Sequence, residues 1–214
     1  MEGKDLLDEK EDGSLDKKYA IIKKEGSGAT SKVFVVEDKD KKSDKIFAAK
    51  VIKELSPQKL KQMKITPLEL YSNEIKILNQ LKKFNCPYIA NIIESGEGEV
   101  KRTNKPITTN KYIILDYAEK GCLFDYIYYP GSGLKEEYCR LIFGKIFKAI
   151  KVCHDAKICN LDIKLENILF DENFNPKLCD FGFGKIGGDQ VTIKVGTLKY
   201  MAPEVLSTSL MDLM

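Results

Sequence analysis

The sequence predicts an α+β protein in two parts, with strands in the first part and helices in the second. Three runs rich in β-branched and aromatic residues lie at 19–26, 32–38 and 45–52, with turn residues between them. Apolar residues repeat at helical spacing over 134–156, where we expect a long buried helix. Strands followed by helices favour an α+β arrangement.

The composition is that of a soluble globular protein. The 214 residues are 43% hydrophobic and 31% charged, and a formal net charge of +3 gives no support for a nucleic-acid partner. The N-terminus is charged from its second residue, and no apolar run is long enough for membrane insertion. The six cysteines contain no C-x-x-C pair, so we expect reduced thiols and a cytoplasmic location.

The first 18 residues contain seven acids and four lysines without apolar periodicity. We therefore expect residues 1–18 to form a disordered charged tail, with folding from Tyr19 onward. The lysine-rich stretch 39–64 has nine lysines and three acids, which is typical of a solvated surface.

A helix is predicted from Pro67, because Thr66 can cap it and Glu69 completes a capping box. Further strands are predicted at 88–96 and 111–118, with a polar loop between them.

The predicted helix places a carboxylate within an apolar stripe. Glu74 shares one helix face with Leu70, Leu78 and Leu81. A buried acid requires a cation. Lys50, on an apolar strand face 24 residues earlier, could neutralise it.

Two glycine-rich stretches resemble nucleotide-binding loops. "GFGKIG" at 182–187 fits the dinucleotide pattern, but no helix pattern follows it. "GSGATSKV" at 26–33 lies between two predicted strands, where it could be a simple turn or could cover phosphates.

The stretch "CNLDIKLENILF" at 159–170 also has two interpretations. Polar and apolar residues alternate from Asn160 to Glu166, as in a half-buried strand. Asp162, Lys164 and Asn167 could instead be catalytic.

Taken in order, six features resemble the eukaryotic protein kinases. They are the glycine loop at 26–33, "AAK" at 48–50, Glu74, "NLDIKLEN" at 160–167, "DFG" at 180–182 and "APE" at 202–204. The resemblance implies a protein-kinase-like fold with a small β-rich N-lobe at 19–117. An incomplete, mainly helical C-lobe would follow at 118–214, ending just after the "APE" motif.

The resemblance also implies the catalytic roles. Asp162 would be the catalytic base, and Lys164 would stabilise the transferred phosphoryl group. Lys50, oriented by Glu74, would hold the phosphates of ATP. Asn167 and Asp180 resemble the Mg²⁺ ligands, and Thr197 matches a threonine that contacts the catalytic Asp and Lys.

By the same resemblance, Val33, Ala48 and Leu169 would enclose the adenine of ATP. Residues implied for nucleotide binding are Gly26, Ser27, Gly28, Val33, Ala48, Lys50, Asp116, Ala118 and Leu169. Lys164 and "GTLKYMAPE" resemble the Ser/Thr branch, closest to calcium/calmodulin-dependent-like kinases, so the expected partner is a protein substrate with a Ser/Thr acceptor.

The catalytic motif departs from the family pattern. Asn160-Leu161 replaces His-Arg, so an activation-loop phosphate would lack its usual arginine. A buried Asn160 must find hydrogen bonds, in a column with Leu78, Ile92 and Phe181. Ser31 replaces the third glycine of the loop.

Ten residues follow Glu204, whereas the family's C-lobe continues. We therefore expect exposed apolar surface on Leu161, Ile163, Val205 and Leu206, and a partner that covers it. The alternatives to an active kinase are a weak or inactive pseudokinase, or a fragment of a longer active kinase.

Overall fold

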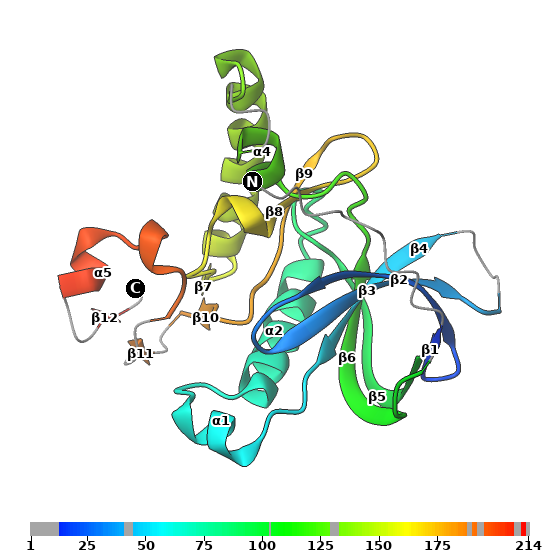
Figure 1. The fold of residues 1–214 in the computed structure, drawn as a ribbon. Helices are drawn as coiled ribbons and strands as arrows, with labels where there is room; N and C mark the ends of the chain where they lie inside the picture. Colours follow the sequence, from blue (N-terminus) through cyan, green and yellow to red (C-terminus); the bar gives the residue numbers. More distant parts are fainter. Residues whose placement is uncertain are drawn as a thin grey trace, which may run out of the picture. The chain divides into compact units, whose positions relative to one another are not determined.

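A computed structural model describes the chain in two compact units. The described residues are 13–40, 45–102, 104–128, 133–187, 190–191, 195–207 and 211–212. The sheet unit comprises Met1–Pro67 and Ile93–Tyr117, and the helical unit comprises Leu68–Ile92 and Ala118–Met214. Figure 1 labels the elements of both units.

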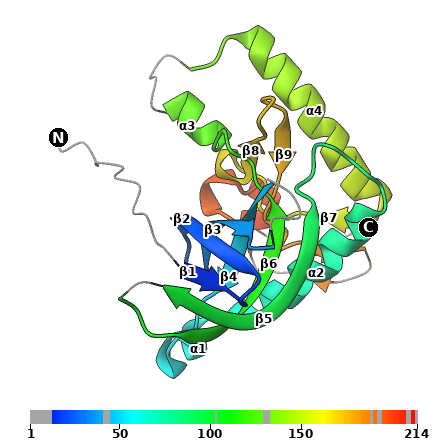
Figure 2. The ribbon, with the colours of Figure 1, turned by 90° about the vertical axis from the view of Figure 1, so that its right-hand side faces the viewer.

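The sheet unit contains a closed barrel with the strand order β1-β2-β3-β4-β6-β5. The strands are β1 (Gly13–Leu15), β2 (Tyr19–Ser27), β3 (Ser31–Asp38), β4 (Ile46–Ile52), β5 (Ile92–Arg102) and β6 (Thr108–Asp116). β2, β3 and β4 pair antiparallel in chain order, which confirms the predicted meander. Figure 2 shows how strongly these strands curve.

The barrel has its own apolar core. Its buried residues are Leu15, Tyr19, Ile21, Phe34, Val36, Ala49, Val51, Val100, Tyr112 and Ile114. Alternate residues of a strand point to opposite faces. Ala49 and Val51 of β4 face this core, so Ala48 and Lys50 lie on the other face of the sheet.

The predicted charged tail is too long, because Gly13–Leu15 forms a strand. β1 pairs with β2 and β5, and only 1% of Leu15 is exposed. A β-carbon on Gly13 would collide with the carbonyl oxygen of Lys101, so this close strand approach requires glycine. One buried leucine in a charged stretch gives no periodic signal, which explains the error. The predicted tail residues 1–12 lie outside the described residues.

A short helix that was not predicted follows the barrel strand β4. α1 (Pro57–Gln62) begins after Ser56, whose hydroxyl accepts a hydrogen bond from the Lys59 amide at 3.4 Å. Proline at the first helical position fits this start.

The helical unit contains the predicted helix α2 (Pro67–Lys82). Its other helices are α3 (Leu123–Tyr128), α4 (Glu136–Asp155), η1 (Leu165–Asn167), η2 (Leu198–Tyr200) and α5 (Pro203–Ser207). Its short strands are β7 (Ile158–Cys159), β8 (Ile168–Phe170), β9 (Pro176–Leu178), β10 (Lys185–Ile186), β11 (Gln190–Val191) and β12 (Met211–Asp212). They pair as β7–β10, β8–β9 and β11–β12.

The apolar face of α2 is buried together with its acid. Glu74 is 2% exposed, beside Leu78 and Leu81 at 3% and 2%. This confirms the carboxylate within the apolar stripe. At the end of the helix, Lys82 Nζ donates to the carbonyl oxygen of Ile92 at 2.8 Å.

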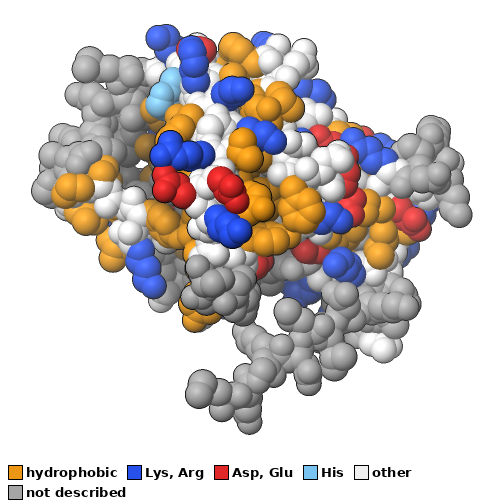
Figure 3. All heavy atoms as spheres, turned by 90° about the horizontal axis from the view of Figure 1, so that it is seen from above, with side chains coloured by type: hydrophobic (Ala, Val, Ile, Leu, Met, Phe, Trp, Pro, Cys, Tyr) orange, Lys and Arg blue, Asp and Glu red, His pale blue; other side chains and the backbone are white. Residues whose placement is uncertain are grey.

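The prediction that α4 is buried is wrong. Only Ile146, Ala149 and Cys153 are buried, whereas Leu141 and Phe147 are 65% and 64% exposed. The helix carries apolar residues on more than one face, and composition cannot tell which face packs. On the surface drawn in Figure 3, hydrophobic side chains are likewise exposed among charged ones.

All six cysteines are free. Burial raises the pKa of the Cys153 thiol to about 12, so this thiol stays protonated at neutral pH. Among the helices of the described residues, none is both long enough and apolar enough to cross a membrane.

Candidate active site

The segment between β7 and η1 is an irregular loop rather than a strand. Strand pairing stops at Cys159 and resumes at Ile168. Leu161 has a φ of 65°, in the left-handed region that interrupts an extended chain. The strand interpretation of residues 160–167 is therefore wrong.

Asp162, Lys164 and Thr197 form a closed triangle of hydrogen bonds. Lys164 Nζ donates to Asp162 Oδ2 at 2.8 Å and to Thr197 Oγ1 at 2.9 Å. The Thr197 hydroxyl donates to Asp162 Oδ1 at 2.7 Å. Asp162 is 4% exposed, so its buried charge is neutralised within the loop. The predicted contact of Thr197 is present.

Asn167 fixes the same carboxylate from the other end of the loop. Its Nδ2 donates to the Asp162 carbonyl oxygen at 2.9 Å and to Oδ2 at 3.2 Å. The backbone oxygen of Asn167 accepts a hydrogen bond from the Cys179 amide at 3.0 Å. Asn167 therefore lies next to the segment that carries Asp180.

The "DFG" segment at 180–182 is held against α2. Phe181 is fully buried, and Asp180 has a φ of 57°. Asn73 Nδ2 on α2 donates to the carbonyl oxygens of Gly182 and Gly184 at 2.9 and 2.8 Å. The sequence reasoning missed Asn73. Its only signal is a residue of poor helix propensity beside Glu74.

Asn160 satisfies its buried amide by bridging two motifs. Its Oδ1 accepts a hydrogen bond from the Asp162 amide at 3.0 Å, and its Nδ2 donates to the Asp180 carbonyl oxygen at 3.2 Å. The side chain is 5% exposed. The predicted need for hydrogen bonds at Asn160 is thus met.

Three residues were predicted to share a column with Asn160, and all three are buried. Leu78, Ile92 and Phe181 are at most 3% exposed. The expected apolar surface is present in part: Ile163 and Leu206 are exposed, at 38% and 42%, whereas Leu161 and Val205 are half-buried.

The residues predicted to bind nucleotide are divided between the units. In the sheet unit, Gly26 and Ser27 end β2, Gly28 lies in the turn, Val33 lies on β3, Ala48 and Lys50 on β4, and Asp116 ends β6. Ala118 and Leu169 belong to the helical unit. The same unit contains the predicted catalytic and metal-binding residues other than Lys50, which are Glu74, Asp162, Lys164, Asn167 and Asp180.

The glycine loop in the sheet unit is a tight hairpin. The Gly28 amide donates to the Ser31 carbonyl oxygen at 3.0 Å, and Gly26 pairs with Val33 across the hairpin. Among the described residues, no atom lies within 4 Å of a β-carbon built on Gly26 or Gly28. Both glycines therefore face open space.

Comparison with known sequences agrees with this geometry. Residues 19–212 match the family described as protein kinase domain. The chain belongs to the protein kinase family. Its two units are a β-rich N-terminal part and a more helical part that fits an incomplete kinase fold.

Relatives of this kinase chain are named as protein kinases. The carbon catabolite-derepressing protein kinase of Secale cereale is 33% identical over 197 residues, covering 91% of this chain and 36% of the relative. Serine/threonine-protein kinase SRK2C of Arabidopsis thaliana is 33% identical over 199 residues, covering 91% and 51%. The chain thus spans between about a third and a half of the length of these relatives.

Protein kinases use ATP with Mg²⁺, and the residues present fit that ion. The Asn167 side-chain nitrogen donates hydrogen bonds to Asp162, so the side-chain oxygen Oδ1 is the atom that could bind the ion. This oxygen and the Asp180 carboxylate are hard donors of the type Mg²⁺ takes. Within the described ranges no cluster of three or more His, Cys, Asp or Glu could hold a metal, so ATP oxygens and water would complete the coordination.

Proposed function

We propose that this chain is the catalytic part of an ATP-dependent protein serine/threonine kinase, which transfers the γ-phosphate of ATP to Ser/Thr hydroxyls of protein substrates. The observation that carries the proposal is the closed triangle of Asp162, Lys164 and Thr197. It orients a carboxylate and a cation before any substrate binds.

Asp162 accepts or orients the proton of the incoming hydroxyl. Lys164 balances the negative charge on the transferred phosphoryl group. Asn167 and Asp180 would hold Mg²⁺ through their side-chain oxygens, and the ion would supply positive charge that offsets the charge of the phosphates.

Lys50 contacts the ATP phosphates, with Glu74 as its orienting acid. The backbone amides of Gly26, Ser27 and Gly28 cover those phosphates. Val33, Ala48 and Leu169 enclose the adenine, and the backbone of Asp116 and Ala118 binds its edge. The Asp116 carboxylate is engaged elsewhere, because Lys45 Nζ donates to it at 2.9 Å.

The substrate is a protein with a Ser or Thr acceptor. The kinase itself acts in the cytoplasm. A further partner covers the predicted apolar surface, of which Ile163 and Leu206 are exposed. Leu161 offers no cation to a phosphate, so activation-loop phosphorylation is not the switch.

The test is label transfer from γ-labelled Mg-ATP to a mixture of Ser/Thr-containing proteins, using the full chain. Asp162→Asn is expected to lower the turnover number by about 10²- to 10⁴-fold. The matched control is Asp155→Asn, which removes an exposed carboxylate paired with Lys151 and should leave transfer unchanged. Equal transfer by Asp162→Asn and the unmodified chain would contradict the proposal. Binding of Mg-ATP without transfer would indicate a nucleotide-binding pseudokinase instead.

A further inference from the structure

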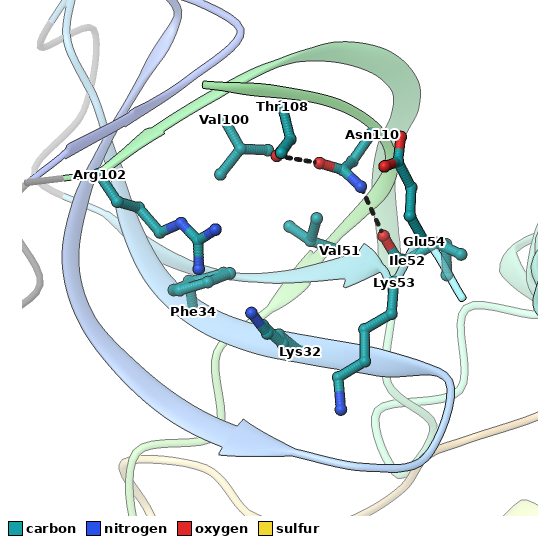
Figure 4. A pocket seen from close by; sticks show the side chains of 10 residues that line it. All are labelled: Lys32, Phe34, Val51, Ile52, Lys53, Glu54, Val100, Arg102, Thr108 and Asn110. Carbon is teal, nitrogen blue, oxygen red and sulfur yellow. Dashed lines mark hydrogen bonds between the residues drawn. The ribbon is translucent and has the colours of Figure 1, made fainter. Parts of the chain in front are cut away.

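A pocket of about 300 Å³ opens into the barrel of the sheet unit (Figure 4). Its apolar floor consists of Phe34 on β3, Val51 on β4 and Val100 on β5, which are 1%, 5% and 2% exposed. The volume is at the lower end of the range for small-molecule sites. A flat apolar body fits such a floor.

Two cationic side chains enter this pocket from different strands. Lys32 of β3 and Arg102 of β5 lie on the same side of the pocket as the Phe34 ring (Figure 4). The Arg102 guanidinium carbon lies 6.0 Å from the centre of that ring. Because strand residues alternate between faces, these groups belong to the opposite side of the sheet from Lys50.

Neither cation is neutralised within the described part of the chain. Arg102 Nε is buried there without a hydrogen-bond partner. Burial and the positive charge of Arg102 lower the pKa of Lys32, followed in effect by Lys53 and Lys24. Two partly desolvated cations that lie close together repel each other, and an anion between them would relieve that repulsion.

The other polar groups that line the pocket do not fill the space between Lys32 and Arg102. Glu54, the acid that lines the pocket, lies at the other end beside Asn110 (Figure 4). Lys53 Nζ donates to the Gly28 carbonyl oxygen, away from the floor. Asn110 Nδ2 donates to the Ile52 carbonyl oxygen at 2.9 Å, and this bond holds the rim in place.

We infer that this pocket binds a small organic phosphate, with the dianionic phosphate between Lys32 and Arg102 and an apolar or aromatic body over Phe34, Val51 and Val100. Two unmatched cations suit a dianion better than a single negative charge. The guanidinium is a preferred phosphate partner because its N–H groups form a planar fork.

The experiment measures the binding of phenyl phosphate to the full chain by calorimetry, and by the methyl NMR shifts of Val51 and Val100. Benzyl alcohol, benzoate and inorganic phosphate are the comparison probes. Phenyl phosphate should bind at least about tenfold more tightly than each of them, because only it supplies both the dianion and the ring. Equal binding of benzyl alcohol, or no shift of either valine, would overturn the inference.

Substitutions of Lys32 and Arg102 test whether each cation contributes to phosphate binding. Lys32→Met and Arg102→Gln should each weaken phenyl phosphate binding at least about tenfold. Lys39→Met, an exposed lysine outside the pocket, should change the Kd less than twofold. Lys32→Met keeps the test valid if Arg102→Gln does not fold. Unchanged binding by Lys32→Met rejects the site.

A Lys50→Met variant separates this site from the proposed ATP site. It should weaken Mg-ATP binding and leave the Kd for phenyl phosphate within twofold. If Lys50→Met weakens phenyl phosphate binding as much as Lys32→Met does, the probe occupies the nucleotide site and the inference is wrong.

Discussion

The helical unit and the sheet unit differ in how their charged side chains are paired: Asp162 is buried and paired, whereas Lys32 and Arg102 are half-buried and lie close to each other. Around Asp162, the carboxylate meets Lys164, Thr197 and Asn167, all within hydrogen-bond distance. In the barrel pocket, Lys32 and Arg102 share a cavity, and within the described ranges no acid lies between them. The hydrogen-bond network around Asp162 is therefore complete before a ligand binds, whereas the cations of the barrel pocket have no anionic partner among the described residues.

The difference has a physical consequence for each site. A buried charge is tolerated when it is paired and hydrogen-bonded, and the paired groups then lose their freedom to reorient. Such preorganised dipoles favour catalysis because they need not rearrange during the reaction. The unmatched cations instead create an electrostatic preference for anions.

The largest change in stability should come from removing the two hydrogen bonds that Asn160 makes in the helical unit. Asn160→Leu keeps the branched side-chain shape but leaves the Asp162 amide and the Asp180 carbonyl oxygen without their partner. We expect the free energy of unfolding to fall by about 2–4 kcal/mol, measured by urea denaturation.

The control is Asn173→Leu, which changes an exposed asparagine and should stay within about 0.5 kcal/mol. Asn160→His retains a donor and should recover part of the loss. A stability equal to that of the unmodified chain in Asn160→Leu would show that the bridge contributes nothing.

The triangle around Asp162 can be opened with little change in packing. Thr197→Val removes the hydroxyl that joins Asp162 and Lys164 but keeps the side-chain shape. We expect the turnover number for phosphoryl transfer to fall about tenfold or more, because the carboxylate is less well oriented.

Thr197→Ser keeps the hydroxyl and should retain most of the activity. Both variants should unfold within a few degrees of the unmodified chain. If Thr197→Ser loses as much activity as Thr197→Val, the hydroxyl is not the cause.

Alkaline pH should destabilise the barrel through Tyr19. Burial, with a hydrogen bond to Glu94 at 2.8 Å, raises the pKa of Tyr19 from 10.0 to about 12. The folded state then holds this proton more tightly than the unfolded state, so its contribution is complete below pH 10 and is lost between pH 10 and 12. The slope for one group is at most about 1.4 kcal/mol per pH unit.

The measurement is the free energy of unfolding between pH 9 and 12, followed by urea denaturation. Tyr19→Phe should flatten the decline, whereas Tyr138→Phe, which alters an exposed side chain on α4, should not. Parallel curves for the unmodified chain and Tyr19→Phe would exclude Tyr19 as the titrating group.

Local patterns predicted the elements whose signals are periodic. The strands β2 to β4 have β-rich runs bounded by turn residues, and the sequence of α2 has a capping pattern and an apolar face. The order of six short motifs predicted a catalytic role for residues 160–167, although this segment alone resembles a strand. The conformation of Leu161 in the left-handed region separates the two, and no propensity reveals it.

Features made by distant residues could not be predicted. Leu15 is buried because β1 pairs with β5, some 85 positions away along the chain. The barrel pocket joins Lys32 and Arg102 from two strands that are not neighbours in sequence. The exposed side of α4 depends on which of its apolar faces packs, and a helical repeat cannot decide that.

The smallest predicted effect is a gain in stability rather than a loss. Lys32→Met removes a desolvated cation that repels Arg102. Without a ligand, we expect the free energy of unfolding to rise only slightly, because solvent screens a half-exposed side chain. Lys164→Met, which removes the partner of the buried Asp162 carboxylate, should lower it. Urea denaturation of both variants at low salt compares them directly, because added salt screens the repulsion between Lys32 and Arg102. A loss of stability in both variants would mean that Lys32 is matched after all and that the two sites do not differ in this respect.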